Sequence, residues 1–292
     1  MSQFLIPDPE ARKAIETVVH AGSEMCWTCR SCINECPVNL ATGRLQPLKI
    51  VRLANLGLLE ELIQSPEIWY CLTCNRCNYV CPMLVKPADL ILYAREEAKR
   101  NEVISYEDLK TYRDLLFRFQ RARWHLARRC QNGTEIDAQI VRSRWERWLD
   151  EPVEIPKETI SITASCGALL PRRSAADGYS PSACFTCSEC SNNCPIFSGR
   201  EVFDPMWIFR MTNLGLFEEL LASPSLWLCI ACQRCTRNCS QAIEGHHVIR
   251  RLQEMAVERG YVEKGFPYRW DLAGKYLFPR FLEEVDRILK SS

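Results

Sequence analysis

The stretch CWTCRSCINECP, residues 26–37, decides the fold of this chain, because its four cysteines have the spacing C-x2-C-x2-C-x3-C. The same spacing occurs three more times, so 16 of the 18 cysteines in the 292-residue chain fall into four runs. The runs are Cys26, Cys29, Cys32 and Cys36; Cys71, Cys74, Cys77 and Cys81; Cys184, Cys187, Cys190 and Cys194; and Cys229, Cys232, Cys235 and Cys239. Proline follows the first three runs, whereas Ser240 follows the fourth.

This spacing is that of bacterial ferredoxins, in which three close thiolates bind one [4Fe-4S] cluster and the fourth ligates the other cluster of a pair. Zinc is the rival metal. Zinc sites typically combine two C-x2-C pairs across a longer loop, often with histidine. The histidines here all lie outside the runs, at His20, His125, His246 and His247. Four runs in two matched pairs therefore favour iron–sulfur clusters over zinc.

Composition and the N-terminal segment indicate an ordinary globular protein in a reducing compartment. A composition of 47% hydrophobic and 25% charged residues excludes the disordered and fibrous classes, and the net charge of +1 indicates no particular partner. The first twenty residues lack the basic and apolar regions of a signal peptide, and no uncharged apolar run is long enough to cross a bilayer. We therefore expect a cytoplasmic protein, where disulfides are rare.

The four runs belong to an internal duplication. Cys184 follows Cys26 by 158 positions, and Cys229 follows Cys71 by the same 158. Of the 31 positions from 47 to 77, 17 are identical to those 158 residues later, including the NLGL of residues 55–58. Each half is therefore expected to be a complete unit.

Helical signals fill the space between and after the runs. Apolar residues recur at helical spacing over 47–53 and again over 58–63, with Gly57 between the two segments. A further helix is predicted to begin at Pro87, and the second unit repeats the pattern over 205–221 and 245–259. Strand signals are almost absent, so the sequence predicts an all-α fold.

The order of these motifs resembles the C subunit of heterodisulfide reductase. A cysteine run precedes a helical segment that ends in NLGLLEELIQSPEIWYC, residues 55–71, and a second run with a helix follows. The likeness covers residues 20–100 and again 178–260. It implies two tandem alpha-helical ferredoxin domains, four [4Fe-4S] clusters, and a place between an A-like flavoprotein subunit and a B-like catalytic subunit.

The resemblance also implies crossed ligation within each unit. The implied ligand sets are Cys26, Cys29, Cys32 with Cys81; Cys71, Cys74, Cys77 with Cys36; Cys184, Cys187, Cys190 with Cys239; and Cys229, Cys232, Cys235 with Cys194. The expected domains are 1–104 for the first unit, 105–178 for a basic helical connector and linker, and 179–292 for the second unit with a C-terminal tail. The tail, 265–290, is expected to cap the second unit or to dock a partner.

The connector is predicted to hold one long basic helix. Ser105 with Asp108 offers an N-terminal cap, and the helix is expected to run from Tyr106 to Arg129. Residues 112–129 contain six arginines and only one aspartate. Such a basic helix suggests a surface that binds nucleic acid or anionic lipid. A solvated face that docks on an acidic partner or on the other unit is favoured, because the whole-chain charge is near zero and no nucleic-acid motif accompanies it.

Several residues near the runs have two readings. Cys130 and Cys166 are expected to be small buried residues, although Cys166 lies in a loop that is able to approach a partner's cofactor. Ser240 is either simply tolerated or supplies an N–H donor to the cluster, which would raise its potential. Helix-surface or capping roles are favoured over ligation for His246 and His247. For Trp69 and Trp227, shielding of the clusters from water, which tunes the reduction potential, is favoured over a role as electron carriers.

Missing motifs exclude several enzyme classes. The sequence has no G-x-G-x-x-G, no P-loop, no adjacent cysteine pair of a disulfide-reducing subunit, and no plant-type ferredoxin spacing. We therefore expect an electron-transfer subunit of a hetero-oligomeric oxidoreductase, without a substrate site of its own and without nucleic acid. The alternatives are a membrane-associated complex linked to quinone or cytochrome b, and a structural or redox-sensing protein stabilised by clusters.

Overall fold

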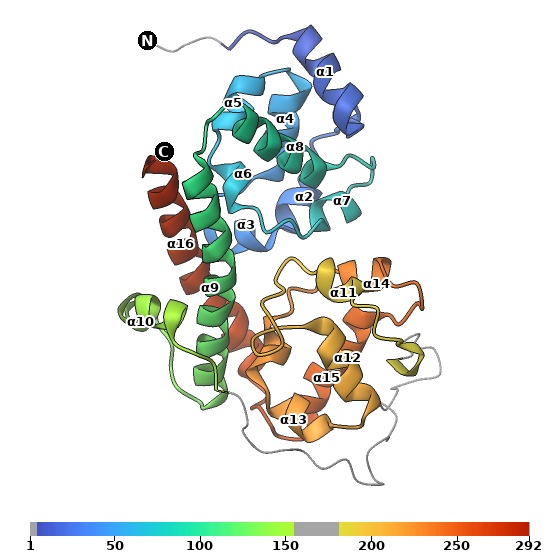
Figure 1. The fold of residues 1–292 in the computed structure, drawn as a ribbon, viewed down its shortest axis with the longest axis vertical. Helices are drawn as coiled ribbons and strands as arrows, with labels where there is room; N and C mark the ends of the chain where they lie inside the picture. The colour runs from blue at the N-terminus through green and yellow to red at the C-terminus, as the bar shows by residue number, and fades with distance from the viewer. Residues whose placement is uncertain (1–4, 155–180, 292) are drawn as a thin grey trace. The chain divides into compact units, whose positions relative to one another are not determined.

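The computed structural model describes residues 5–154 and 181–291. The chain divides into unit 1, Met1–Asp114 with Phe278–Ser292, and unit 2, Leu115–Leu277. Every regular element in the described ranges is a helix, which confirms the all-α prediction (Figure 1). None of these helices is long and apolar enough to cross a membrane. The domain boundaries expected at residues 104 and 178 stay predictions.

Unit 1 is built from short helices around the first two cysteine runs. The elements are α1 (Pro9–Val19), η1 (Ser23–Met25), α2 (Ser31–Asn34), α3 (Pro37–Thr42), α4 (Pro47–Asn55), α5 (Leu59–Gln64), α6 (Glu67–Tyr70), α7 (Arg76–Tyr79) and α8 (Pro87–Arg100). Proline at the first position of α1, α4 and α8 fixes a helical φ where no N–H partner is needed. Helices α4 and α5 pack against α8 (Figure 1). The core includes Ile50, Leu62 and Leu90.

Unit 2 repeats this arrangement. Its elements are α10 (Ala138–Asp150), η2 (Pro181–Ala183), α11 (Glu189–Asn192), α12 (Pro205–Asn213), α13 (Phe217–Ala222), η3 (Pro224–Leu228), α14 (Arg234–Arg237) and α15 (Gly245–Glu258). Helices α12 and α13 pack against α15, as α4 and α5 pack against α8. The duplication read from the sequence therefore recurs in the packing.

Two long helices, α9 (Tyr106–Gln131) and α16 (Phe266–Ser291), contribute residues to both units because the unit boundaries fall inside them. The predicted start of α9 is confirmed, since the Asp108 N–H donates to Ser105 Oγ at 3.0 Å. Gly133, with φ of 70°, follows its end.

The C-terminal tail contributes to unit 1 as well as to unit 2, which the sequence does not predict. Its last part belongs to unit 1, where Asp286 on α16 forms an ion pair with Arg44 at 2.9 Å and accepts a hydrogen bond from the Tyr70 hydroxyl. Capping of the second unit, the first of the two expected roles, therefore describes only the beginning of this helix.

Helix α10 is not among the helices expected from the sequence. Asp137 caps it by accepting from the Ile140 N–H at 2.7 Å, and Trp145 packs on Phe119 of α9 with ring centroids 6.2 Å apart. The local signal for this helix is a cap residue followed by two tryptophans that become buried. It lies outside the duplicated segments, which guide the rest of the interpretation.

Candidate metal centres

Each cysteine run folds into the same strained loop. Two residues in every run, at the second and fourth positions after the first cysteine, have φ between 53° and 66°. They are Thr28 and Arg30, Thr73 and Asn75, Thr186 and Ser188, and Ala231 and Gln233. A left-handed residue other than glycine costs about 1–2 kcal/mol. Strain that recurs at the same positions in all four loops indicates a backbone shaped for a ligand.

A one-turn helix follows each strained loop and carries the third cysteine of its run. These helices are α2, α7, α11 and α14. Some thiols are already hydrogen-bonded within the loop, since the Thr73 N–H lies 3.2 Å from Cys71 Sγ and the Ala231 N–H lies 3.4 Å from Cys229 Sγ. Such N–H donors stabilise negative charge on sulfur.

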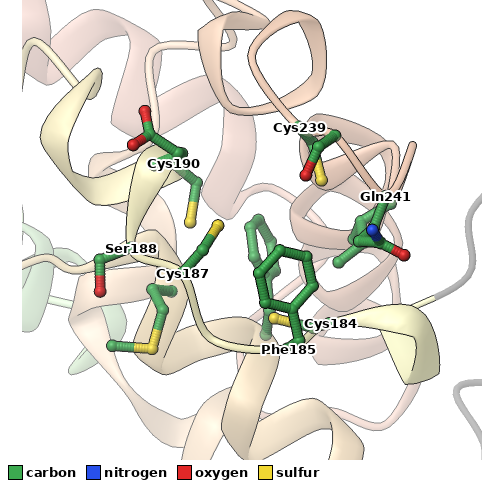
Figure 2. Close-up of a pocket in the computed structure, with 12 residues that line it drawn as sticks. Cys184, Phe185, Cys187, Ser188, Cys190, Cys239 and Gln241 are labelled. Atoms are coloured by element: carbon green, nitrogen blue, oxygen red, sulfur yellow. The ribbon is translucent and has the colours of Figure 1, made fainter.

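In unit 2 the loops enclose two cavities lined by cysteines. One, of about 350 Å³, is lined by Cys184, Cys187 and Cys190 together with Cys239 from the other run (Figure 2). The second, of about 340 Å³, is lined by Cys229, Cys232 and Cys235 together with Cys194. Three thiols from one run and one from its partner run therefore meet at each cavity.

Unit 1 brings its cysteines together in the same way. A cavity of about 340 Å³ is lined by Cys36, Cys71, Cys74 and Cys77. The remaining set gathers around Cys32. Burial raises the pKa of Cys32 to about 11, and the neighbouring charges of Cys26, Cys29 and Cys81 add to this effect.

The donor chemistry of these sites fits an iron–sulfur cluster. Burial raises the pKa of Cys36 and Cys190 to about 12 and that of Cys229 to about 11, because a lone thiolate is poorly solvated there. Four soft thiolates per site suit Zn²⁺ or an iron–sulfur core, and a bound cation replaces the thiol protons. Such a core would be held by these side chains alone and would supply one-electron redox chemistry.

The two thiol sets of each unit differ in exposure. Cys29 and Cys187 are exposed, and the aromatic residues near them, Trp27 and Phe185, are 72% and 58% exposed. Cys71, Cys74 and Cys77 are buried in unit 1, and Cys232 is buried in unit 2. Each unit therefore has one thiol set with an exposed cysteine and one set without, which we call the inner set. The inner set is buried in unit 1, whereas in unit 2 Cys232 is buried and Cys194, Cys229 and Cys235 are half-buried.

Two arginines beside the inner thiol sets are missed by sequence reasoning. Arg95 on α8 donates to the carbonyl of Cys71 at 2.6 Å. Arg123 on α9, only 5% exposed, donates to the carbonyl of Leu228, directly before Cys229, at 2.9 Å. One signal is visible in the sequence: Gln253 stands 158 positions after Arg95, so the duplicated helix loses a charge.

The basic helix α9 is not the solvated face that the sequence favours. Besides the buried Arg123, Arg118 forms an ion pair with Asp150 at 2.8 Å, and Arg121 donates to the Leu149 carbonyl at 3.0 Å. A solvated face is therefore not found at these three arginines, because they contact α10 and the second cysteine loop of unit 2. The contact of Arg123 with that loop agrees with the expected docking on the other unit.

The cysteines outside the runs have separate outcomes. Cys130 is buried at 2% exposure, which confirms the prediction, and burial raises its pKa to about 11. Cys166 lies outside the described residues.

Ser240 lines the cavity that contains Cys239. Both interpretations of this residue, a tolerated substitution and an N–H donor to the cluster, therefore stay open.

Three of the histidines contact polar groups of neighbouring residues. His246 Nδ1 lies 2.7 Å from Thr236 Oγ1, and His247 Nδ1 lies 3.4 Å from Glu244, both near the start of α15. Burial, followed by the charge of His247, lowers the pKa of His246 to about 4. His125 Nε2 lies 3.0 Å from the Glu151 carbonyl oxygen. The Glu244 contact agrees with a surface role for His247. His246 differs from the expectation, because it lines the inner cavity of unit 2 together with Cys194, Cys229, Cys232 and Cys235.

The tryptophans before the inner thiol sets are buried. Trp69 is 2% exposed and Trp227 is 5% exposed. Trp69 packs edge-on against Tyr112 with centroids 5.3 Å apart, and Trp227 lies 4.5 Å from the Phe266 ring. Neither ring lines an inner cavity, so shielding of the clusters from water stays a prediction.

Family models identify both cysteine regions. Residues 25–86 match a 4Fe-4S dicluster domain, and residues 180–243 match a second 4Fe-4S dicluster domain. The chain thus contains two 4Fe-4S dicluster domains in tandem. Each such domain binds two clusters, so the chain holds four [4Fe-4S] clusters rather than zinc ions.

Curated relatives of this chain are C subunits of heterodisulfide reductases. The C subunit of the H(2):CoB-CoM heterodisulfide,ferredoxin reductase of Methanothermobacter thermautotrophicus is 36% identical over 96 residues, which are 32% of this chain and 50% of the relative. The iron-sulfur C subunit of the CoB–CoM heterodisulfide reductase of Methanopyrus kandleri is 31% identical over 83 residues, 28% of this chain and 42% of the relative.

A Methanosarcina mazei relative has a longer match. This protein, the C subunit of a Ferredoxin:CoB-CoM heterodisulfide reductase, is 28% identical over 145 residues, which are 50% of this chain and 81% of the relative. The chain otherwise spans about half the length of the first relatives that it matches. The resemblance to the C subunit of heterodisulfide reductase is confirmed.

Proposed function

We propose that this chain is an iron–sulfur electron-transfer subunit that relays single electrons through its four [4Fe-4S] clusters. The observation that carries the proposal is the pairing, in each unit, of a thiol set that has an exposed cysteine with an inner set that is buried in unit 1 and at least half-buried in unit 2. A surface cluster is accessible to a partner's redox centre, whereas a buried cluster is protected from water and oxidants. Such a pair suits a relay within a larger complex better than a purely structural role.

The crossed ligand sets are part of this proposal. The cavity linings support three of them, and the mutual influence of the Cys26, Cys29, Cys32 and Cys81 thiols supports the fourth. In this arrangement each cluster joins the first cysteine loop of a unit to the second. Cluster binding and folding of the unit are then coupled, as in other structural metal sites.

Partners are proposed from the likeness alone. The names of the relatives point to a heterodisulfide reductase-like complex. The resemblance to that family implies an A-like flavoprotein subunit on one side of the chain and a B-like catalytic subunit on the other. The exposed Trp27 and Phe185 lie next to the surface thiol sets, where a partner's redox centre must approach. A cytoplasmic location stays a prediction.

Metal analysis with redox titration is the first test. After anaerobic purification we expect about 16 iron atoms and about 16 sulfides per chain, from four clusters of four irons. Stepwise reduction followed by EPR is expected to show four reversible one-electron transitions. Stoichiometric zinc, or iron for fewer than three clusters, would contradict the cluster assignment. Full iron without reversible reduction would leave only a structural role.

Copurification distinguishes the classes of partner. Affinity purification of the chain from its native cell, followed by cofactor analysis of the bound subunits, is expected to yield flavin without haem. Recovery of haem b, or quinone reductase activity in the purified complex, would instead support the membrane-associated alternative and contradict the proposed partners.

A further inference from the structure

Unit 1 places a cation against its inner thiol set. The Arg95 side chain donates from Nε to the Ile68 carbonyl at 2.7 Å and from Nη2 to the Cys71 carbonyl at 2.6 Å. Its guanidinium lies 5.5 Å from the ring centroids of both Trp69 and Tyr112. Cys71 itself is buried. The two carbonyls and the two rings therefore hold the guanidinium in one place beside the backbone of Cys71.

Unit 2 keeps the hydrogen bond of this arginine but not its charge. Gln253 is the residue 158 positions after Arg95, and its Nε2 donates to the Leu226 carbonyl at 2.9 Å. Leu226 is itself the counterpart of Ile68. The helix α15 thus preserves the contact to the backbone while it places no cation beside Cys229.

In unit 2 the cation near the inner thiol set is Arg123, which lies on α9, whereas Arg95 of unit 1 lies on α8. Its two terminal nitrogens donate to the Leu228 carbonyl at 2.9 Å and to Gln120 Oε1 at 2.8 Å. The guanidinium lies 5.9 Å from the Trp270 ring centroid. The charges of Cys229 and Cys194, two members of the inner thiol set, are the groups that act on it.

Arg123 is a buried cation whose partners among the described residues are all neutral. Arg123 is only 5% exposed, and an arginine guanidinium keeps its charge in proteins. Its partners among the described residues are a carbonyl, an amide and an aromatic ring, none of them anionic. A buried cation without a countercharge is strongly unfavourable. Four thiolates give a bound [4Fe-4S] cluster a net negative charge, which supplies it.

We propose that Arg95 and Arg123 are equivalent positioning residues that raise the reduction potential of the inner cluster in their respective units. Reduction adds an electron to an already negative cluster, and a fixed cation in a poorly solvated site stabilises the added charge. Arg234 and its counterpart Arg76 line the inner cavities of both units, so a cation at this position is common to the two units. Arg76 forms an ion pair with Glu35, and the counterpart of Glu35 is the neutral Asn193. This inference rests on the proposed function.

The test compares charge-changing variants of the full-length, cluster-loaded chain by EPR redox titration. In Arg123→Gln one of the four transitions is expected to shift to lower potential, with the reduced-to-oxidised ratio at fixed potential falling about tenfold, or 59 mV for one electron. Arg95→Gln is expected to shift a different transition by a similar amount. Arg123→Lys keeps the charge and is expected to keep most of the potential.

Rescue and control variants make the result specific. Adding Gln253→Arg to Arg123→Gln returns a cation to the Arg95-like position and is expected to restore the shifted transition. Arg121→Gln, on the same helix but bonded to Leu149, is expected to leave all four transitions unchanged. These comparisons separate the local charge from a general effect of removing an arginine from α9.

Iron content separates the possible failures. Four clusters with unchanged potentials in Arg123→Gln would overturn the inference and leave the proposed function intact. Fewer than three clusters in the unmodified chain would overturn the proposed function itself. Where Arg123→Gln loses iron, the single variant Gln253→Arg decides: a raised potential of one transition supports the inference, and an unchanged one overturns it.

Discussion

In the double variant Cys29→Ala/Cys81→Ala the chain is expected to retain about 12 iron atoms, whereas Cys29→Ala/Cys36→Ala is expected to retain about 8. The difference follows from crossed ligation. Cys29 and Cys81 belong to one proposed cluster, so their joint loss removes a single site. Cys29 and Cys36 lie in the same run but serve different clusters, so their joint loss removes two.

Iron and sulfide analysis of the anaerobically purified variants measures this difference. Cys130→Ala is the matched control, because Cys130 is a buried cysteine outside the runs and its loss is expected to leave about 16 iron atoms. Where a site keeps a three-iron remnant, the number of altered EPR signals, one against two, gives the same answer. The reverse ranking of the two double variants would contradict crossed ligation and support clusters built from one run each.

The parts of the fold that the sequence predicts are those with local signals. Pro47 and Pro87 begin helices because proline suits the first helical position, and the Ser105 hydroxyl caps α9. The cysteine spacing identifies the metal chemistry, since few ligands other than an iron–sulfur cluster require three thiols within seven residues. The repeat then transfers each of these conclusions to the second unit.

The parts that the sequence does not predict depend on tertiary contacts. Ordinary propensities place Thr28 and Arg30 in right-handed or extended backbone, and their left-handed φ values arise from the loop that surrounds the thiols. The missing charge at Gln253 is visible in the repeat, but nothing local shows that Arg123, 130 positions earlier, replaces it. The pairing of Asp286 with Arg44 is hidden for the same reason.

Gly57 in the NLGL motif is expected to be much less tolerant of alanine than Gly43. Both glycines have φ of 69°, so both variants incur the strain of a left-handed alanine, about 1–2 kcal/mol. A Cβ at Gly43 meets nothing within 4 Å, whereas a Cβ at Gly57 would lie 1.9 Å from the Asp8 carbonyl oxygen. Backbone must move in Gly57→Ala, which adds about 2 kcal/mol of overpacking.

The segment that moves is the start of α1. The Asp8 N–H donates to the Leu56 carbonyl at 2.9 Å, and the Asp8 carboxylate caps α1 at the Glu10 and Ala11 N–H groups. Displacement of Asp8 therefore weakens both contacts, although it touches no cysteine loop.

Hydrogen exchange measures the effect on cluster-loaded chains. Amides of α1 are expected to exchange about 30-fold faster in Gly57→Ala than in Gly43→Ala, the ratio that corresponds to about 2 kcal/mol. Both variants should keep about 16 iron atoms, because the change is confined to the packing of α1. Equal exchange of α1 in the two variants would mean that the NLGL glycine is required for its φ alone and not for the close approach of Asp8. Gly215, with φ of 73° at the same place in the second NLGL, would then be explained by backbone conformation as well.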